Sequence, residues 1–224
     1  MVKKSFTRVS LCLLVLAFSV TALAASKEGI VTINGGRQTV RMNPPTNARV
    51  APAHRDAKLK TIYSNLGTGT DLYYCCEGWT ISGTSSPVGE AQWIGAPFTP
   101  TKAAKVTKID VAVGYVEGTN QIVVKLAADA SGLPGKTMHS WTFKNMPTFG
   151  SSYTLLDTVK DTKGIKVGKK QYWVTVTTNT KDADLWGAWC FTWNFATGTY
   201  AYEINDGGWQ SANSDLVALD VKGN

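Results

Sequence analysis

Histidine and cysteine are scarce in this chain, and their scarcity excludes several kinds of site. The 224 residues include two histidines, His54 and His139, and four cysteines. No Cys-x-x-Cys pair occurs, so a zinc site built from Cys and His ligands is not expected. The sequence also has no Gly-x-Ser-x-Gly elbow and no glycine-rich loop in a strand–loop–helix setting. We therefore predict no metal site, no cofactor and no catalytic residue, and so a protein that is not an enzyme.

Long apolar segments are also missing, because the one apolar run is short. It covers residues 9–20, too few to span a bilayer comfortably. Basic residues precede the run, and Ala22-Leu23-Ala24 after it has the small-x-small pattern that signal peptidase cleaves. We therefore predict that residues 1–25 are a signal peptide. The mature protein is expected to be secreted or periplasmic, without stable membrane insertion.

The formal net charge of +7 is unevenly distributed along the chain. Residues 26–60 hold seven basic and two acidic residues, a net of +5, whereas residues 61–224 hold 13 basic and 14 acidic residues, a net of −1. A nucleic-acid-binding domain is expected to carry its positive charge on the folded part. We therefore predict no nucleic-acid partner, and we interpret residues 26–60 as a basic, flexible arm or linker.

From residue 61 onward, short β-rich runs follow one another and no sustained helical period is present. Residues 108–115 and 121–128 alternate apolar and polar side chains, and the tight connection at residues 118–120 predicts that they form a hairpin. Residues 170–178 are the clearest strand, since β-branched and aromatic side chains fill them. The prediction is an all-β fold: an antiparallel, two-sheet, jelly-roll-like β-sandwich over residues 61–224, preceded by the flexible arm.

Several short motifs occur in order along this predicted domain. They are residues 62–67, the series Tyr74-Cys75-Cys76-x-Gly78-Trp79-x-Ile81-x-Gly83, residues 96–100, residues 107–112, and Asp129-x-x-Gly132-x-Pro134-Gly135. Together, over residues 61–221, they resemble the choice-of-anchor R domain of secreted and surface bacterial proteins. The resemblance implies an exported β-sandwich and offers no catalytic residues. Residues 220–224 lack a sorting signal of the kind that fixes such proteins to the cell surface, so we expect free secretion or periplasmic residence.

Three cysteines follow the predicted signal peptide: Cys75, Cys76 and Cys190. An odd number leaves at least one thiol free or paired with another chain. Adjacent Cα atoms lie about 3.8 Å apart across a trans peptide, below the usual disulfide range of about 4.4–6.8 Å. Neighbours in a strand also point to opposite faces, so only one of them could meet Cys190. We therefore expect either Cys75 or Cys76 to bridge to Cys190. A Cys75–Cys76 bridge, of a kind that can line ligand sites, is the alternative.

The chain is rich in tryptophan, and all eight lie beyond residue 60. In residues 189–195 the aromatic side chains share one parity, which predicts that this face packs in the core. A core already filled by Ile, Val and Leu has limited room for eight indoles, so some should lie near the surface. Trp186 and Trp209 are the candidates, because Asp184 and Asp206 lie beside them in turn-like sequence. An exposed ring flanked by oxygen acceptors can bind a sugar, whereas the alternative is a polar hairpin tip capped by a tryptophan.

These patterns favour a non-catalytic protein for extracellular binding or surface interaction, with a polysaccharide or cell-surface glycan as the expected partner. The alternative is a structural cell-surface or matrix protein without a small ligand. A glycan-active hydrolase is a further alternative, and it would require two converging carboxylates, such as those of Glu77 and Glu90.

Overall fold

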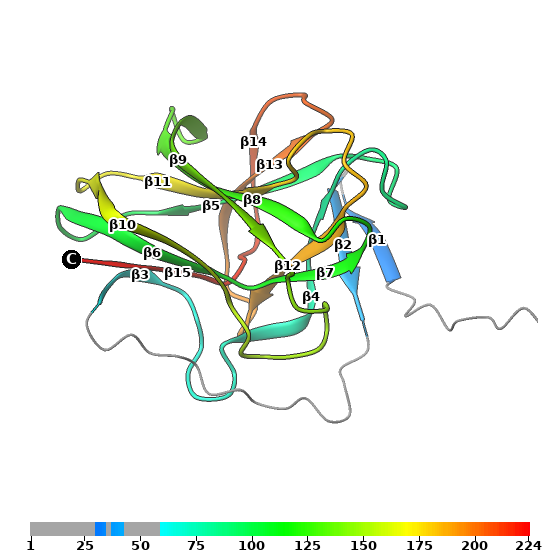
Figure 1. Cartoon of the computed structure of the whole chain (residues 1–224), viewed down its shortest axis with the longest axis horizontal. Helices are drawn as coiled ribbons and strands as arrows, with labels where there is room; N and C mark the ends of the chain where they lie inside the picture. Colours follow the sequence, from blue (N-terminus) through cyan, green and yellow to red (C-terminus); the bar gives the residue numbers. More distant parts are fainter. Residues whose placement is uncertain (1–29, 35–36, 43–58) are drawn as a thin grey trace, which may run out of the picture.

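The computed structural model describes residues 30–34, 37–42 and 59–224 of the chain. In these residues all regular secondary structure is β-strand, and no helix is long and apolar enough to span a bilayer. The predicted signal peptide at residues 1–25 lies outside the described residues, as does the segment 43–58 of the predicted arm. The strands form two antiparallel sheets, and this confirms the predicted β-sandwich (Figure 1).

Eleven of the described strands belong to the larger sheet, whose main path runs β1-β2-β4-β5-β11-β8-β9. Strand β12 pairs with β4 and β7, and β13 pairs with β5 and β14. The bounds of these strands are β1 (Ile30–Asn34), β2 (Arg37–Arg41), β4 (Tyr73–Ser82), β5 (Gln92–Phe98), β7 (Val113–Glu117), β8 (Gln121–Asp129), β9 (Pro134–Lys144), β11 (Tyr172–Thr177), β12 (Trp186–Thr192), β13 (Thr197–Ile204) and β14 (Gln210–Asp215).

The smaller sheet has four described strands in the order β10-β6-β15-β3. Their bounds are β3 (Lys60–Ser64), β6 (Ala104–Val111), β10 (Asp157–Val167) and β15 (Leu219–Gly223). This sheet lies against β5, β8 and β11 of the larger one (Figure 1). The last strand of the chain, β15, pairs with β3 and β6, so residues near both ends of the predicted domain meet in one sheet.

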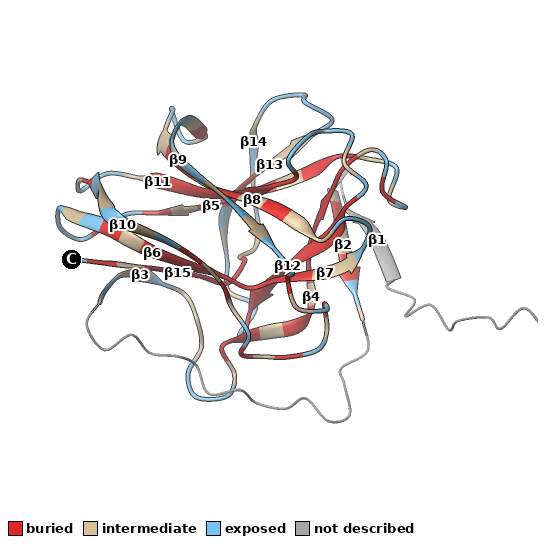
Figure 2. Ribbon diagram, in the orientation of Figure 1, coloured by how far each residue is buried: buried red, intermediate tan, exposed pale blue. Residues whose placement is uncertain are grey.

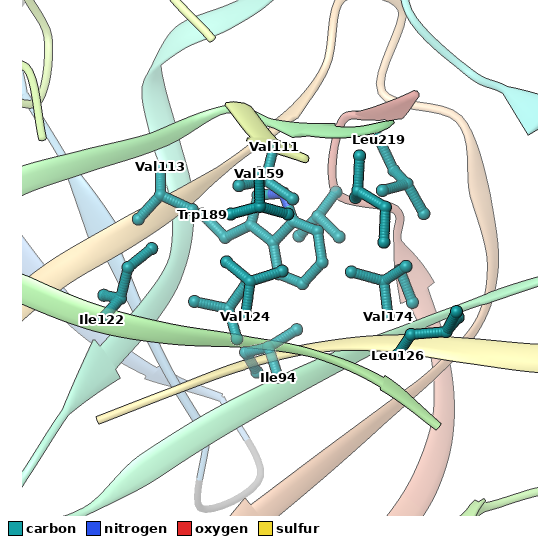
Figure 3. Close-up of a cluster of buried hydrophobic side chains, with 14 of the residues drawn as sticks. Ile94, Val111, Val113, Ile122, Val124, Leu126, Val159, Val174, Trp189 and Leu219 are labelled. Carbon is teal, nitrogen blue, oxygen red and sulfur yellow. The ribbon is translucent and has the colours of Figure 1, made fainter. Parts of the chain in front are cut away.

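The core lies between the two sheets because alternate residues of each strand point inward. Trp189 is fully buried, and Figure 3 shows it among side chains from both sheets, including Val111, Val124 and Val159. Its indole Nε1 donates a hydrogen bond to the carbonyl oxygen of Ala218 at 2.8 Å. Figure 2 shows the same burial along β4, β11 and β12.

The predicted hairpin between residues 108–115 and 121–128 is wrong. The first run is divided between β6 in the smaller sheet and β7 in the larger one, and β7 pairs with β12 instead of β8. Strand β8 has β11 and β9 as its neighbours. The chain passes from one sheet to the other near Ala112 while its apolar residues still face the core. The period-two pattern therefore continues across the change of sheet and conceals it.

The motif at residues 129–135 covers the outer face of the larger sheet. Trp173 points to this face yet is fully buried. The carboxylate of Asp129 accepts hydrogen bonds from Trp173 Nε1 at 2.7 Å and from the Gly132 amide at 3.1 Å. A Cβ added at Gly95 would lie 3.2 Å from the Pro134 side chain, so the loop approaches the sheet closely at a glycine. This loop packs over a separate, small apolar group on the outside of the sheet, formed by Ala127, Trp173 and Ala201.

Part of the basic arm belongs to the larger sheet. Strand β2 pairs with β4, matching Thr39 with Trp79 and Arg41 with Glu77. The Arg37 guanidinium lies over the Trp79 and Tyr202 rings, at 5.8 and 5.2 Å from their centroids. Its Nη1 also donates a hydrogen bond to the Tyr200 hydroxyl at 2.7 Å. Cation–π contacts and strand pairing thus attach this hairpin to the sandwich.

Candidate functional site

The candidate site begins with the connection between β3 and β4 at residues 65–72 (cyan in Figure 1). Its first residue, Asn65, anchors the connection to the segment that leads into β15. The Asn65 side chain donates a hydrogen bond to the Val217 carbonyl at 2.8 Å and accepts one from the Leu219 amide at 2.7 Å. The connection then folds tightly on itself. A Cβ at Gly67 would lie only 2.0 Å from the carbonyl oxygen of Asp71, so this position requires glycine.

The second part of the site is the turn that follows β12. The strand ends at Thr192, whose hydroxyl accepts a hydrogen bond from the Ala196 amide at 2.9 Å. Phe195 has a φ of 52°, in the left-handed region that suits a sharp reversal. Trp193 and Asn194 lie at this reversal instead of continuing the strand. The alternation that buries Trp189 and Phe191 therefore stops before Trp193.

Four aromatic side chains gather at this turn, and we term them the aromatic cluster: Tyr74, Tyr153, Trp193 and Phe195. The Tyr74 ring lies 4.8 Å from that of Phe195, and the Tyr153 ring meets that of Trp193 edge-on at 5.8 Å. Trp193 and Phe195 are 40% and 39% exposed, and they are the two aromatic residues among the exposed large hydrophobic side chains of the described residues. The contacts hold the Trp193 ring in place while leaving much of it open to solvent.

An open pocket of about 250 Å³ lies beside Trp193. Its lining consists of Asn65, Leu66, Gly67, Thr68, Asp71, Trp193 and Asn194. Asp71 is the one charged residue in this lining, and its carboxylate accepts a hydrogen bond from the Thr70 hydroxyl at 3.3 Å. The arrangement offers one aromatic surface with amide, hydroxyl and carboxylate groups around it. It can bind a ring that has an apolar face and carries hydrogen-bonding substituents.

Electrostatics link the pocket to the aromatic cluster. The pKa of the Tyr153 phenol is raised, first by burial and then by the nearby Tyr74 and Asp71. A negative charge on Asp71 opposes ionisation of this phenol. Asp71 is therefore close enough to the aromatic cluster for its charge to act on Tyr153.

A disulfide between Cys75 and Cys76 lies next to Tyr74 in β4. The expected bridge to Cys190 is wrong, because Cys190 is a buried free thiol whose Sγ donates to the Cys75 carbonyl at 3.7 Å. The β4–β12 register jumps here: Cys190 pairs with Gly78, and the next residue of β12 pairs with Tyr74. The cysteine pair thus lies in a bulge of β4, where the strict alternation assumed from the sequence does not hold. Both sulfur-bearing side chains are buried, so the bridge supports the site from beneath and does not line the pocket.

A buried group of titratable side chains lies near this bulge. Asp157 is 2% exposed, and one of its carboxylate oxygens has no hydrogen-bond partner. Loss of solvation raises its pKa to about 8, and a backbone hydrogen bond from Val113 only partly opposes this. Burial, together with the Asp157 charge, also raises the pKa of the Cys190 thiol. Burial raises the pKa of Tyr73 as well, and its hydroxyl donates to the Leu155 carbonyl at 2.7 Å.

The two tryptophans proposed from the sequence lie in different apolar clusters. Trp186 is only 9% exposed, packs with Cys190 and Ala188, and therefore cannot act as an open platform. Trp209 is half-buried against the group around Trp173 on the outer face of the larger sheet. The structure thus does not bring Trp186 and Trp209 together in one site.

The two aspartates proposed to flank them are exposed but already have partners. Asp184 accepts hydrogen bonds from the Thr119 hydroxyl and amide, both at 3.1 Å, and these bonds lower its pKa. Asp206 lies 3.3 Å from the Lys181 ammonium. Both carboxylates hold neighbouring loops in place, in agreement with the interpretation of these segments as polar turns.

Other acidic residues are also dispersed. Glu77 lies 3.7 Å from Arg41 Nε, and Glu90 accepts a long hydrogen bond of 3.4 Å from Gln38. Over the described ranges, no group of three or more His, Cys, Asp or Glu side chains is placed to hold a metal ion.

Trp193 is the functional candidate that sequence reasoning missed. Its parity with Trp189 and Phe191 assigned it to the core, because the strand was assumed to continue to residue 195. The available signal was Asn194, a residue type that favours turns, directly after it.

Comparison with known proteins adds no relative. A scan against protein-family models, a search of curated proteins and a search of solved structures each find no match to this chain. The resemblance to choice-of-anchor R domains therefore stays a prediction.

Proposed function

We propose that this protein is an exported, non-catalytic binding protein that holds one sugar ring of a polysaccharide or cell-surface glycan against Trp193. The observation that carries the proposal is the 40% exposed indole, held by Tyr74 and Tyr153 at the edge of a polar pocket. Sugar rings present apolar C–H faces and hydroxyl groups, and this pocket offers a matching aromatic face with polar neighbours.

The size of the pocket supports a single ring as the bound unit. Its volume of about 250 Å³ lies below the roughly 300–1,000 Å³ typical of sites for drug-sized ligands. Because the pocket is open, the remainder of a longer chain can continue into solvent. Export is supported by the predicted signal peptide and by the resemblance to secreted and surface bacterial proteins.

Glycan-array binding of the purified protein tests the proposal, with Trp193→Ala as the decisive variant. If stacking removes about 50 Å² of apolar surface from water, it contributes about 1.3 kcal/mol, and its loss should weaken binding by about tenfold. Trp209→Ala is the matched control, since this half-buried tryptophan lies outside the pocket lining. Binding should survive in the control.

Two outcomes would overturn the proposal. A wild-type protein that binds no glycan would favour the structural or matrix alternative. Undiminished binding by Trp193→Ala would place the glycan elsewhere on the protein.

A further inference from the structure

The pocket beside Trp193 is lined by one negatively charged residue and by no positively charged one. Among its lining residues, Asp71 is acidic and none is a lysine, arginine or histidine. Within residues 59–224, the Asp71 carboxylate accepts the Thr70 hydrogen bond and makes no ion pair. The same charge raises the pKa of Tyr153 in the aromatic cluster. The one charged group that borders this pocket is thus a carboxylate.

An aromatic face beside a carboxylate that has no ion-pair partner among the described residues matches a ligand that combines an apolar ring face with a positive charge. A cation is attracted by the face of an indole ring, and more strongly when a carboxylate lies nearby. A uronic acid or a sulfated sugar would meet like charge instead, and no basic residue of the lining could compensate for it.

We propose that the pocket selects glycans whose sugar units carry a free amine. This inference rests on the proposed function, because it specifies which sugar lies on Trp193. The ammonium group of an amino sugar pairs with Asp71, the ring lies on the indole, and Thr68 and Asn194 bind neighbouring hydroxyls.

A sugar is favoured over a simple ammonium compound because Trp193 is the one aromatic residue in the pocket lining. Selective binding of a quaternary ammonium group relies on several rings that enclose it. Here Tyr74 and Tyr153 contact Trp193 itself, and the rest of the lining is polar or small.

A matched pair of oligomers tests the selection. One is a β-1,4-linked glucosamine oligomer with free amines, and the other is the same oligomer with every amine acetylated. Calorimetry at weakly acidic pH and low salt should show the free-amine oligomer binding about tenfold more tightly. The preference should shrink as salt is added, since a charge pair at an open pocket is screened. An acidic oligomer of uronic acid should not bind.

Asp71→Asn is the key variant, because asparagine keeps the side-chain shape and the Thr70 partner but removes the charge. It should bind both oligomers with nearly equal affinity. Asp206→Asn is the control, since it removes one exposed carboxylate outside the pocket lining. It should keep the full preference, and near-UV circular dichroism should show that both variants are folded.

The failure of this inference is distinct from the failure of the proposed function. Suppose that Trp193→Ala weakens the binding of both oligomers. If wild type then shows no preference for the free-amine oligomer, or if Asp71→Asn keeps that preference, amine selection is refuted and glycan binding stands. Free choline that displaces the bound oligomer as well as free glucosamine oligomer does would also refute amine-sugar selection, because the pocket would then recognise any ammonium group. If no oligomer binds and the glycan array is also blank, both proposals fall.

Discussion

Asp157 should make the stability of this protein fall as pH rises, and Asp157→Asn should remove the part of that dependence that this residue contributes. The carboxyl group is 2% exposed at the start of β10, and burial raises its pKa to about 8. In the unfolded chain its pKa returns to 3.8. Between these values the folded protein holds a proton that the unfolded chain has lost. The free energy of unfolding therefore decreases as pH rises from about 4 to about 8.

The magnitude follows from the two pKa values. A separation from 3.8 to about 8, at about 1.4 kcal/mol per pKa unit, sets an upper limit of about 6 kcal/mol. Tyr73 and Cys190 are the titratable groups that interact with Asp157, and both have raised pKa values, so they stay neutral over this range. Asparagine resembles the protonated carboxyl group in shape and has no charge to desolvate.

Urea unfolding followed by tryptophan fluorescence provides the assay. At about pH 4 or below, wild type and Asp157→Asn should agree within about 1 kcal/mol, whereas at about pH 9 the variant should be more stable by several kcal/mol. The raised pKa values of Glu203, Asp215 and Asp220 give both proteins a shared slope in the same direction, so the difference between them isolates Asp157.

Asp182→Asn is the matched control, because this exposed aspartate has a lowered pKa and so acts only at lower pH. If the free energy of unfolding varied with pH in parallel for wild type and Asp157→Asn, the reasoning would be refuted. Ionising the buried carboxylate would then cost no more than ionising it in the unfolded chain.

The remaining predictions concern the core, the arm and the cysteines. Trp189→Ala should lower the free energy of unfolding by about 3–5 kcal/mol in urea titrations, through the cavity it leaves between the sheets. Arg37→Ala should cost about 1–2 kcal/mol, whereas Arg41→Ala, whose side chain is 65% exposed, should cost under about 0.5 kcal/mol; equal effects would contradict the cation–π attachment. Cys190 should react with an alkylating reagent only in denaturant, and non-reducing tryptic mapping should find the Cys75–Cys76 bridge within one peptide; a peptide linked to Cys190 would contradict it.

Much of the architecture was predictable because strand formation and burial leave local patterns. Residues 170–178 were predicted as a strand, and β11 covers Tyr172–Thr177 with every residue buried. The absence of helical periodicity predicted an all-β fold, and two antiparallel sheets confirm it. Strand partners are non-local, however, and this is why the expected pairing of residues 108–115 with 121–128 was wrong.

The candidate site was harder to predict, because exposure depends on where a strand ends in space. The alternation from Trp189 to Phe195 is unbroken in the sequence, yet β12 stops at Thr192 and the chain turns. Trp186 shows the reverse case, since it lies in turn-like sequence beside Asp184 and is nevertheless covered by a second apolar cluster.

Period-two patterning and turn residues were enough to predict that this chain forms an antiparallel sandwich, since both properties arise from residues close together in the chain. The disulfide partner of Cys75, the exposure of Trp193 and the pocket beside it were decided only by tertiary structure. A bulge in β4 brings the two neighbouring cysteines together, and the segments that form the pocket lie more than 120 residues apart in the sequence. Only the packing of β3, β4 and β12 makes them neighbours, because contacts between distant segments depend on the whole fold and leave no local period to detect.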